Sequence, residues 1–226
     1  MATVSEQPSP APTAPQSDRI AVHNPATGEV IGHVPDLGAE AVAELARRGR
    51  AAQPAWEALG FEGRGLVLRR AQQWVVDNAD RVIETIVAET GKAWEDAQLA
   101  ELLYAANAFG FWAKQAPSYL ADERVRSANV LLKGKRLVLR YRPLGLAGVI
   151  GPWNYPLTNS FGDCIPALAA GNSVILKPSE VTPLTSLVMA DALRECGLPD
   201  GVFAVATGTG ATGAALVDAV DMIMFT

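Results

Sequence analysis

One turn of this chain could supply a hydrogen-bond donor to a reacting oxygen. The apolar run Leu146–Ile150 leads into Gly-Pro-Trp-Asn-Tyr-Pro, where the two prolines stop the strand and prevent an immediate helix. This turn exposes Trp153 and Asn154. The neutral NH2 of Asn154 can donate to a developing alkoxide without titrating. A turn asparagine can equally serve only to bond its own backbone, and the Trp-Asn pair alone leaves both interpretations open.

A second apolar run, Val174–Leu176, delivers Lys177 and Glu180 at its carboxyl end. Pro178 forces the chain out of the sheet between them, so both side chains should project over one crevice. A carboxylate accepts hydrogen bonds from ribose hydroxyls, an ammonium donates to one of them, and the carboxylate repels a 2′-phosphate. The alternative is a surface ion pair without function, which contributes about 0–1 kcal/mol.

A third segment, Gly208-Thr-Gly-Ala-Thr-Gly213, has the GxGxxG spacing of phosphate-binding loops. It follows the third apolar run of its region and not the first, and the acidic residue expected about 20 positions later would lie beyond Thr226. Glycines that let a helix pack closely on a strand give the same letters. Pyrophosphate binding and close packing therefore both remain open, and contact with the adenine side of a cofactor is favoured over either.

Alternating strands and helices must position these segments. Four runs are apolar on both faces, as strands inside a parallel sheet are, and they lie at Leu146–Ile150, Val174–Leu176, Val202–Ala206 and Met222–Phe225. Helical spacing separates them at about Asn159–Ala169, Leu184–Cys196 and Thr212–Ala219. The predicted fold class is α/β with a Rossmann-like, doubly wound parallel sheet, whose ligands bind outside the carboxyl ends of the strands.

The chain before this sheet divides into three predicted parts. Residues 1–18, rich in Pro, Ser, Ala and Thr, are expected to form a disordered leader. Residues 19–129 are expected to hold a hairpin around Asn24–Glu29 and then helices over Gly38–Leu59, Glu62–Val76, Asn78–Glu89 and Ala93–Gln115. Residues 130–142 are expected to form a protruding hairpin over Val130–Tyr141 that bends near Gly134. Residues 143–226 are the sheet domain, which we expect to be truncated.

Composition favours small-molecule chemistry. The chain is 49% hydrophobic and 19% charged, with a net charge of -5 and no long single-sign runs, so binding to nucleic acid or to an anionic membrane is not expected. No stretch approaches the roughly 20 apolar residues of a membrane helix. Cys164 and Cys196 lack metal or disulfide spacing, which indicates a reducing cytoplasm and no metal site. His23 and His33 are expected to be surface or structural residues.

Five motifs in chain order resemble those of the aldehyde dehydrogenase family. They are Asn24-Pro-Ala-Thr-Gly-Glu-Val30, Glu89-Thr-Gly-Lys92, the Gly-Pro-Trp-Asn-Tyr-Pro turn, Lys177-Pro-Ser-Glu180 and the terminal Met-Phe-Thr. The resemblance covers about Arg19–Thr226. The Gly-Ala-Thr-Gly-Ala-Ala-Leu-Val and Asp-Met-Ile-Met-Phe-Thr stretches are similar to semialdehyde-oxidising members. The family usually has one more residue between the positions of Gly210 and Gly213, so this chain departs from the pattern there.

The resemblance implies a role for each candidate site residue. Asn154 would donate the oxyanion-hole amide, while Pro152 and Trp153 would flank the nicotinamide half of the cofactor. The adenosine half would lie against the remaining candidates, which are Lys177, Ser179, Glu180 and, near the adenine, Gly210. Because Glu180 would repel a 2′-phosphate, NAD is expected in preference to NADP.

The resemblance also implies an enzyme of which this chain is the amino-terminal part. Family members oxidise an aldehyde to a carboxylic acid with NAD(P)+, using a Cys nucleophile and a Glu base that follow the Phe-Thr strand. Neither Cys164 nor Cys196 matches that nucleophile, so both are expected to pack in the core and the isolated chain is expected to be inactive. The hairpin implies a homo-oligomer. A non-catalytic NAD-binding module and a structural or assembly remnant are the alternatives.

Overall fold

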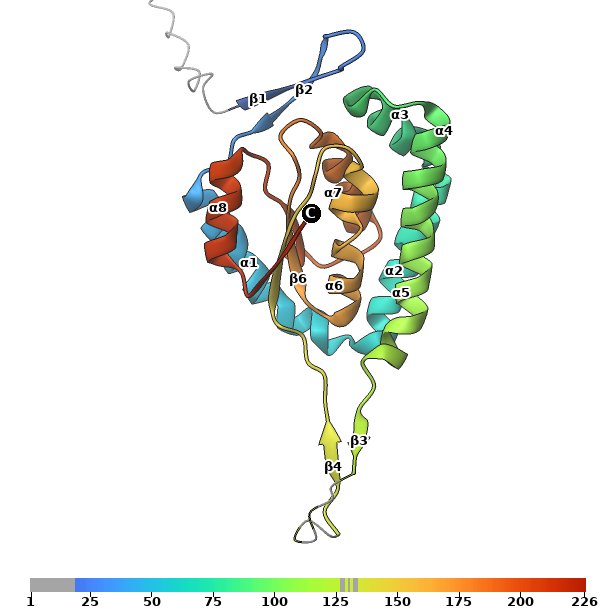
Figure 1. Ribbon diagram of the computed structural model, residues 1–226, viewed down its shortest axis with the longest axis vertical. Coiled ribbons are helices and arrows are strands. Elements are labelled where there is room, and N and C mark those ends of the chain that lie inside the picture. Colours follow the sequence, from blue (N-terminus) through green and yellow to red (C-terminus); the bar gives the residue numbers. More distant parts are fainter. Residues whose placement is uncertain (1–18, 127–128, 130, 132–133) are drawn as a thin grey trace, which may run out of the picture.

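The computed structural model describes residues 19–126, 129, 131 and 134–226, so the expected leader over residues 1–18 lies outside the described residues. Figure 1 shows a central sheet between helical layers, with one hairpin at each end of the molecule. The sheet is parallel, has four strands and is ordered β7-β6-β5-β8. These strands are β5 (Leu146–Ile150), β6 (Ser173–Lys177), β7 (Phe203–Val205) and β8 (Met222–Phe225).

The order of the strands makes this sheet doubly wound, as the sequence predicted. From β5 the chain steps outward through β6 to β7, then returns to pair β8 with the other side of β5. The order therefore reverses between β5 and β8, which is where doubly wound sheets open a crevice at their carboxyl ends. Every residue of β6 is buried, which explains its unbroken apolar run before Lys177.

Helices cover both faces of the sheet. One face packs against α1 (Ala39–Ala58) and α8 (Gly210–Ala219), and the other against α6 (Cys164–Ala170) and α7 (Leu184–Glu195). A further layer lies outside α6 and α7. It consists of α2 (Gly60–Asp77), α3 (Ala79–Thr90), α4 (Trp94–Asp96) and α5 (Leu103–Tyr119).

Two segments depart from the predicted helices. The helix expected over Ala93–Gln115 is interrupted by the π-helical segment η2 (Ala97–Leu102), and the one expected over Asn159–Ala169 is divided into η4 (Pro156–Phe161), also π-helical, and α6. A π turn changes the backbone hydrogen bond by one residue but leaves the apolar spacing nearly unchanged. Periodicity alone therefore could not distinguish these turns from α-helix.

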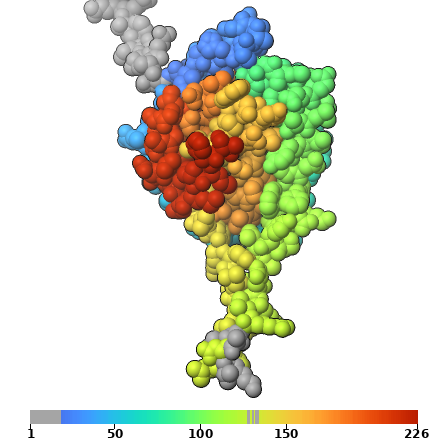
Figure 2. All heavy atoms as spheres, viewed as in Figure 1, coloured from blue at the N-terminus to red at the C-terminus, as the bar shows by residue number. Residues whose placement is uncertain are grey.

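Two antiparallel hairpins project from this body. At one end β1 (Arg19–His23) pairs with β2 (Val30–Pro35), as predicted. At the other end β3 (Glu123–Val125) pairs with β4 (Leu137–Leu139), forming the narrow extension visible in Figures 1 and 2.

The prediction that both strands of the second hairpin lie within Val130–Tyr141 was wrong, because its first strand begins upstream at Glu123. Side chains at its base favour the observed register. Asp122 forms an ion pair with Arg140, and the Tyr141 hydroxyl donates to Glu123 at 2.6 Å.

Candidate functional site

The carboxyl ends of β5 and β6 bring the two predicted motifs together. The Gly151 N–H donates to the Lys177 carbonyl at 3.1 Å, and the Thr182 hydroxyl donates to the Trp153 carbonyl at 3.2 Å. Trp153 and Glu180 line one cavity of about 390 Å³. Segments about 25 residues apart in sequence thus form one continuous rim of the sheet.

The side chain of Lys177 is buried, and that of Glu180 is exposed to solvent. The Lys177 side chain is 6% exposed and that of Glu180 is 45% exposed, with 3.4 Å between the ammonium nitrogen and a carboxylate oxygen. The ammonium also donates to the Pro178 carbonyl at 3.1 Å. Because an ammonium has three donors, one remains for a ligand, and among the described residues the second oxygen of Glu180 has no donor. The pair is therefore suited to binding adjacent hydroxyl groups.

The neighbouring Ser179 is tied to its own turn. Its Oγ accepts the N–H of Val181 at 3.3 Å, and the residue is partly exposed beside Glu180. This hydrogen bond helps hold the turn that carries Glu180 away from the sheet.

The side chain of Asn154 makes the local turn contact and leaves its NH2 available for the predicted role. Its Oδ1 accepts the N–H of Tyr155 at 3.1 Å, which is the local turn contact. Its NH2 has no partner in the described part of the chain, and the residue is exposed. Trp153 beside it is 60% exposed, while Pro152 is half-buried. The donor expected for a reacting oxygen is thus free.

Lys92 and Glu101 contact this turn from the helical layer, and sequence reasoning gave neither a role. The Lys92 ammonium forms an ion pair with Glu101, donates to the Asn154 carbonyl at 2.9 Å and lies 3.7 Å from the centre of the Tyr155 ring. Glu101 is fully buried and accepts the N–H of Leu157 at 2.8 Å. Lys92 stood inside a recognised motif, but a Glu in an apolar helical stretch gave no signal.

Glu89 makes a similar contact beneath the other motif. It is 1% exposed and accepts the N–H groups of Leu184 at 2.7 Å and Thr185 at 3.0 Å, together with the Thr185 hydroxyl. Burial raises the pKa of this carboxyl to about 7, although the hydrogen bonds from Thr185 and Leu184 act in the opposite direction. Glu89 thereby caps the first turn of α7 from the end of α3.

His23 also lies at this rim, although its distance in sequence from the motifs suggested only a surface or structural residue. It lines the cavity shared by Trp153 and Glu180, and its Nδ1 lies 3.4 Å from the Gly28 carbonyl. The first hairpin folds over the carboxyl ends of the strands (Figure 1), which places an exposed imidazole beside the candidate site.

The three glycines of the GxGxxG segment have different surroundings. Gly208 has φ +151°, and a Cβ there would lie 1.9 Å from the Thr212 hydroxyl oxygen, so a side chain cannot fit. A Cβ at Gly210 would contact nothing within 4 Å, and one at Gly213 would make an ordinary 3.6 Å contact with Lys177. Only the tight turn at Gly208 therefore requires glycine, and the adenine contact of Gly210 stays a prediction.

Both cysteines pack in the core, as predicted. Cys164 and Cys196 are free thiols with exposed fractions of 0% and 6%. Burial raises the pKa of the Cys164 thiol well above its ordinary value and also raises that of Cys196. Neither can readily supply a nucleophilic thiolate.

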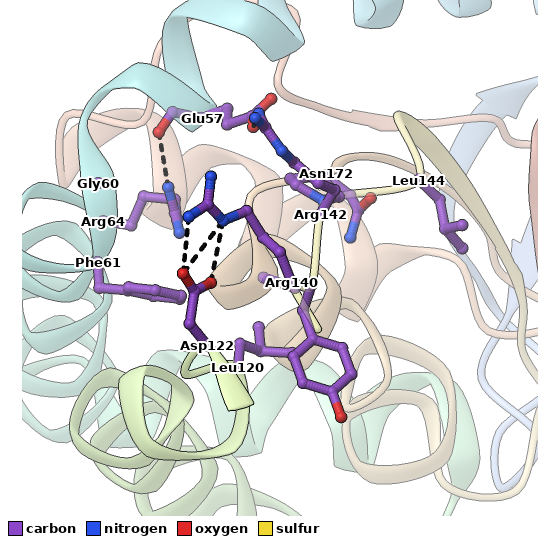
Figure 3. Close-up of a pocket in the computed structure, with 13 residues that line it drawn as sticks. Glu57, Gly60, Phe61, Arg64, Leu120, Asp122, Arg140, Arg142, Leu144 and Asn172 are labelled. Carbon is purple, nitrogen blue, oxygen red and sulfur yellow. Dashed lines mark hydrogen bonds and ion pairs between the residues drawn. The ribbon is translucent and has the colours of Figure 1, made fainter. Parts of the chain in front are cut away.

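A second cavity, of about 420 Å³, lies at the base of the β3–β4 hairpin (Figure 3). Its wall includes Arg64, Asn172 and the Arg140–Asp122 ion pair, which Figure 3 shows as a closed pair. Asn172 directly precedes β6, so this cavity is at the amino ends of the strands. Doubly wound sheets bind ligands at the opposite ends, and the carboxyl rim is therefore the candidate functional site.

In the described part of the chain, no helix combines the length and apolarity needed to cross a membrane. The sequence model of the aldehyde dehydrogenase family matches residues 13–226. A Mycolicibacterium smegmatis protein named "Putative succinate-semialdehyde dehydrogenase (NADP+)" is 40% identical over 204 residues, which cover 88% of this chain and 38% of that protein.

Solved structures of aldehyde dehydrogenases are also similar to this chain. A succinate-semialdehyde dehydrogenase from Burkholderia pseudomallei superposes with a TM-score of 0.86 at 32% identity, covering 93% of this chain and 44% of the other. A NAD-dependent benzaldehyde dehydrogenase from Corynebacterium glutamicum gives 0.84 at 28% identity, covering 92% and 46%. The chain thus spans less than half the length of each of these relatives.

Proposed function

Because the chain belongs to the aldehyde dehydrogenase family, we propose that it supplies the cofactor-binding part of an enzyme that oxidises an aldehyde to a carboxylic acid with NAD(P)+. The observation that carries the proposal is the meeting of the Trp153-Asn154 turn and the Lys177–Glu180 pair at one rim of the sheet. The whole activity is part of the proposal, since the chain covers 38% of its curated relative.

The residues present fit a dinucleotide. Lys177 and Glu180 offer one free donor and one free acceptor for the adenosine ribose, and Ser179 supports their turn. Pro152 and the exposed ring of Trp153 would flank the nicotinamide half, and Gly210 would lie near the adenine. When bound, NAD(P)+ supplies the hydride acceptor.

Asn154 would act on the substrate oxygen. As the aldehyde carbonyl becomes an alkoxide, the free NH2 can donate to it, and this contact strengthens as negative charge develops. The reaction also needs a thiolate nucleophile and a base for water. Since Cys164 and Cys196 are buried with raised pKa values, we propose that residues outside this chain supply both groups and that the chain alone is inactive.

We propose NAD as the preferred cofactor and a semialdehyde as the substrate class. The half-exposed carboxylate of Glu180 would lie beside a 2′-phosphate, which is a like-charge contact. The proposed substrate class rests on two relatives that are named as succinate-semialdehyde dehydrogenases. The name of the Mycolicibacterium smegmatis relative includes NADP+, whereas Glu180 favours NAD in this chain. Glu180 is therefore the residue to test.

Location and assembly complete the proposal. The free, buried thiols of Cys164 and Cys196 favour a reducing compartment, and we propose the cytoplasm. The projecting β3–β4 hairpin exposes Val125 and Leu139, and we propose that it packs against a second copy of the protein.

Calorimetric titration of this chain with NAD+ and NADP+ tests the cofactor site directly. We expect NAD+ to bind more tightly, and Glu180→Gln to weaken NAD+ binding by roughly tenfold, because charge-assisted hydrogen bonds to the ribose are lost. The same change should improve NADP+ binding. Glu84→Gln, which alters an exposed carboxylate on α3, is the matched control. The proposal would be refuted if the chain bound NAD+ and NADP+ with equal affinity and Glu180→Gln changed neither affinity.

A further inference from the structure

The turn that carries Asn154 is held in place by the helical layer as well as by the sheet. Lys92, just after α3, reaches the turn from one side, and Glu101, in η2, reaches the segment that follows it. Among the residues that the structure describes, the Asn154 side chain has one hydrogen bond, which its Oδ1 accepts from the N–H of the next residue. The direction of its carboxamide therefore follows from how the surrounding backbone is held.

The ammonium of Lys92 has little freedom. Its side chain is 11% exposed, and its nitrogen lies at the Glu101 carboxylate, 2.9 Å from the Asn154 carbonyl oxygen and 3.7 Å from a carboxylate oxygen of Asp96. The contacts with Glu101 and with the Asn154 carbonyl are hydrogen bonds, and the longer one with Asp96 is an ion pair only. The ring of Tyr155 covers the same charge at 3.7 Å, which adds a cation–π contact. Lys92 thus contacts both Asn154 and the residue after it.

Glu101 fixes the chain immediately beyond the turn. Its second oxygen accepts the N–H of Leu157 at 2.8 Å and that of Thr158 at 3.4 Å. The Thr158 hydroxyl donates to the Ala100 carbonyl at 2.6 Å, so η2 and η4 are joined at two neighbouring positions. A fully buried carboxylate is costly unless it is paired and hydrogen-bonded. Lys92 provides the countercharge, and the pair therefore acts as one unit.

We infer that Lys92 and Glu101 are positioning residues that set the direction of the Asn154 carboxamide. The importance of that direction for catalysis rests on the proposed function. A displacement of about 1 Å in a reacting geometry can cost about 10²-fold in rate. In the active enzyme, Lys92→Met should therefore lower kcat by up to about 10²-fold and leave the KM for the cofactor nearly unchanged, since Lys177 and Glu180 are untouched.

The side-chain NH2 resonances of Asn154 report this geometry in the present chain. Asparagine labelled with nitrogen-15 gives separate signals for each carboxamide, and Asn154→Ala identifies the signal of interest. We expect Lys92→Met to shift or broaden the Asn154 resonance and Lys92→Arg, which keeps the charge, to restore it largely. The buried Asn172, at the amino end of β6, should be unaffected. Lys114→Met alters an exposed lysine of α5 and is the control.

An unchanged Asn154 resonance in a folded Lys92→Met chain would overturn the inference. Should that variant fail to fold, Glu101→Gln decides, because the amide keeps an acceptor for the Leu157 N–H but removes the charge that holds Lys92. A shift of the Asn154 signal in folded Glu101→Gln supports the inference, and an unaltered signal rejects it.

Calorimetry of the same variants with NAD+ separates this inference from the proposed function. A chain that binds no NAD+ but shows the Asn154 shift would refute the cofactor site and retain the positioning contact. A chain that binds NAD+ but shows no Asn154 shift would retain the cofactor site and refute the positioning contact.

Discussion

The carboxyl group of Glu89 should make the stability of this chain depend on pH, and Glu89→Gln should remove that dependence. Glu89 is 1% exposed, and burial raises its pKa from 4.5 to about 7 against the opposing hydrogen bonds from Thr185 and Leu184. The folded chain therefore binds the proton more tightly than the unfolded chain does. The stabilisation is complete below about pH 4.5 and is lost as the pH rises through about 7.

The size of this effect follows from the pKa difference. A rise of the pKa from 4.5 to about 7, at about 1.4 kcal/mol per pH unit, corresponds to about 3–4 kcal/mol at most. Between about pH 5 and about pH 8 most of this contribution disappears from the native chain. The free energy of unfolding of Glu89→Gln, measured relative to the native chain, should therefore rise by about 2–3 kcal/mol across that interval.

Urea unfolding at the two pH values, followed by tryptophan fluorescence, measures this difference directly. Glu84→Gln is the matched control, because Glu84 is an exposed carboxylate on the same helix. Comparing the two variants separates the effect of the buried carboxyl group from that of placing a glutamine in α3. If the difference between Glu89→Gln and the native chain were independent of pH, the carboxyl group would not titrate as its burial requires, and the reasoning would fail.

Two further predictions concern the core. Trp56→Phe removes the hydrogen bond from the fully buried indole to the Leu168 carbonyl at 2.9 Å, and should lower the free energy of unfolding by about 1–3 kcal/mol in urea titrations. The fully buried ring of Phe161 lies 5.9 Å from that of Phe109 and 5.6 Å from that of Phe203, between ring centres. Phe161→Ala leaves a cavity there and should lower the free energy of unfolding by about 3–5 kcal/mol. Losses below about 0.5 kcal/mol in either variant would contradict the packing described here.

The strands could be predicted from sequence because their signal is local. The runs at Leu146–Ile150 and Met222–Phe225 begin and end where β5 and β8 do. Leu146, Ala147 and Val149 of β5 are apolar and buried, and so is the run Val174–Leu176 of β6, as a parallel sheet buried on both faces requires. Since parallel strands end at a common rim, the meeting of Trp153 with Glu180 followed from the same pattern.

The contacts that hold the rim in place could not be predicted in this way. Glu101 lies 56 residues from Leu157, and Glu89 lies 95 residues from Leu184. Glu89 belongs to the Glu89-Thr-Gly-Lys92 motif, but neither that motif nor the sequence around Glu101 indicates which backbone N–H groups these carboxylates accept. The register of the second hairpin also depends on a contact between residues distant in sequence, the ion pair of Asp122 with Arg140.

The two buried glutamates also explain how the elements at the rim begin. Neither η4 nor α7 has a side-chain cap of its own, since Tyr155 and Pro183 stand at their cap positions. Their first N–H groups are accepted instead by Glu101 and Glu89, from η2 and α3. The outer helical layer therefore completes the hydrogen bonding of the segments that follow β5 and β6. A sheet domain separated from that layer would leave these groups unpaired, which is why residues 19–126 and 143–226 should unfold as one cooperative unit.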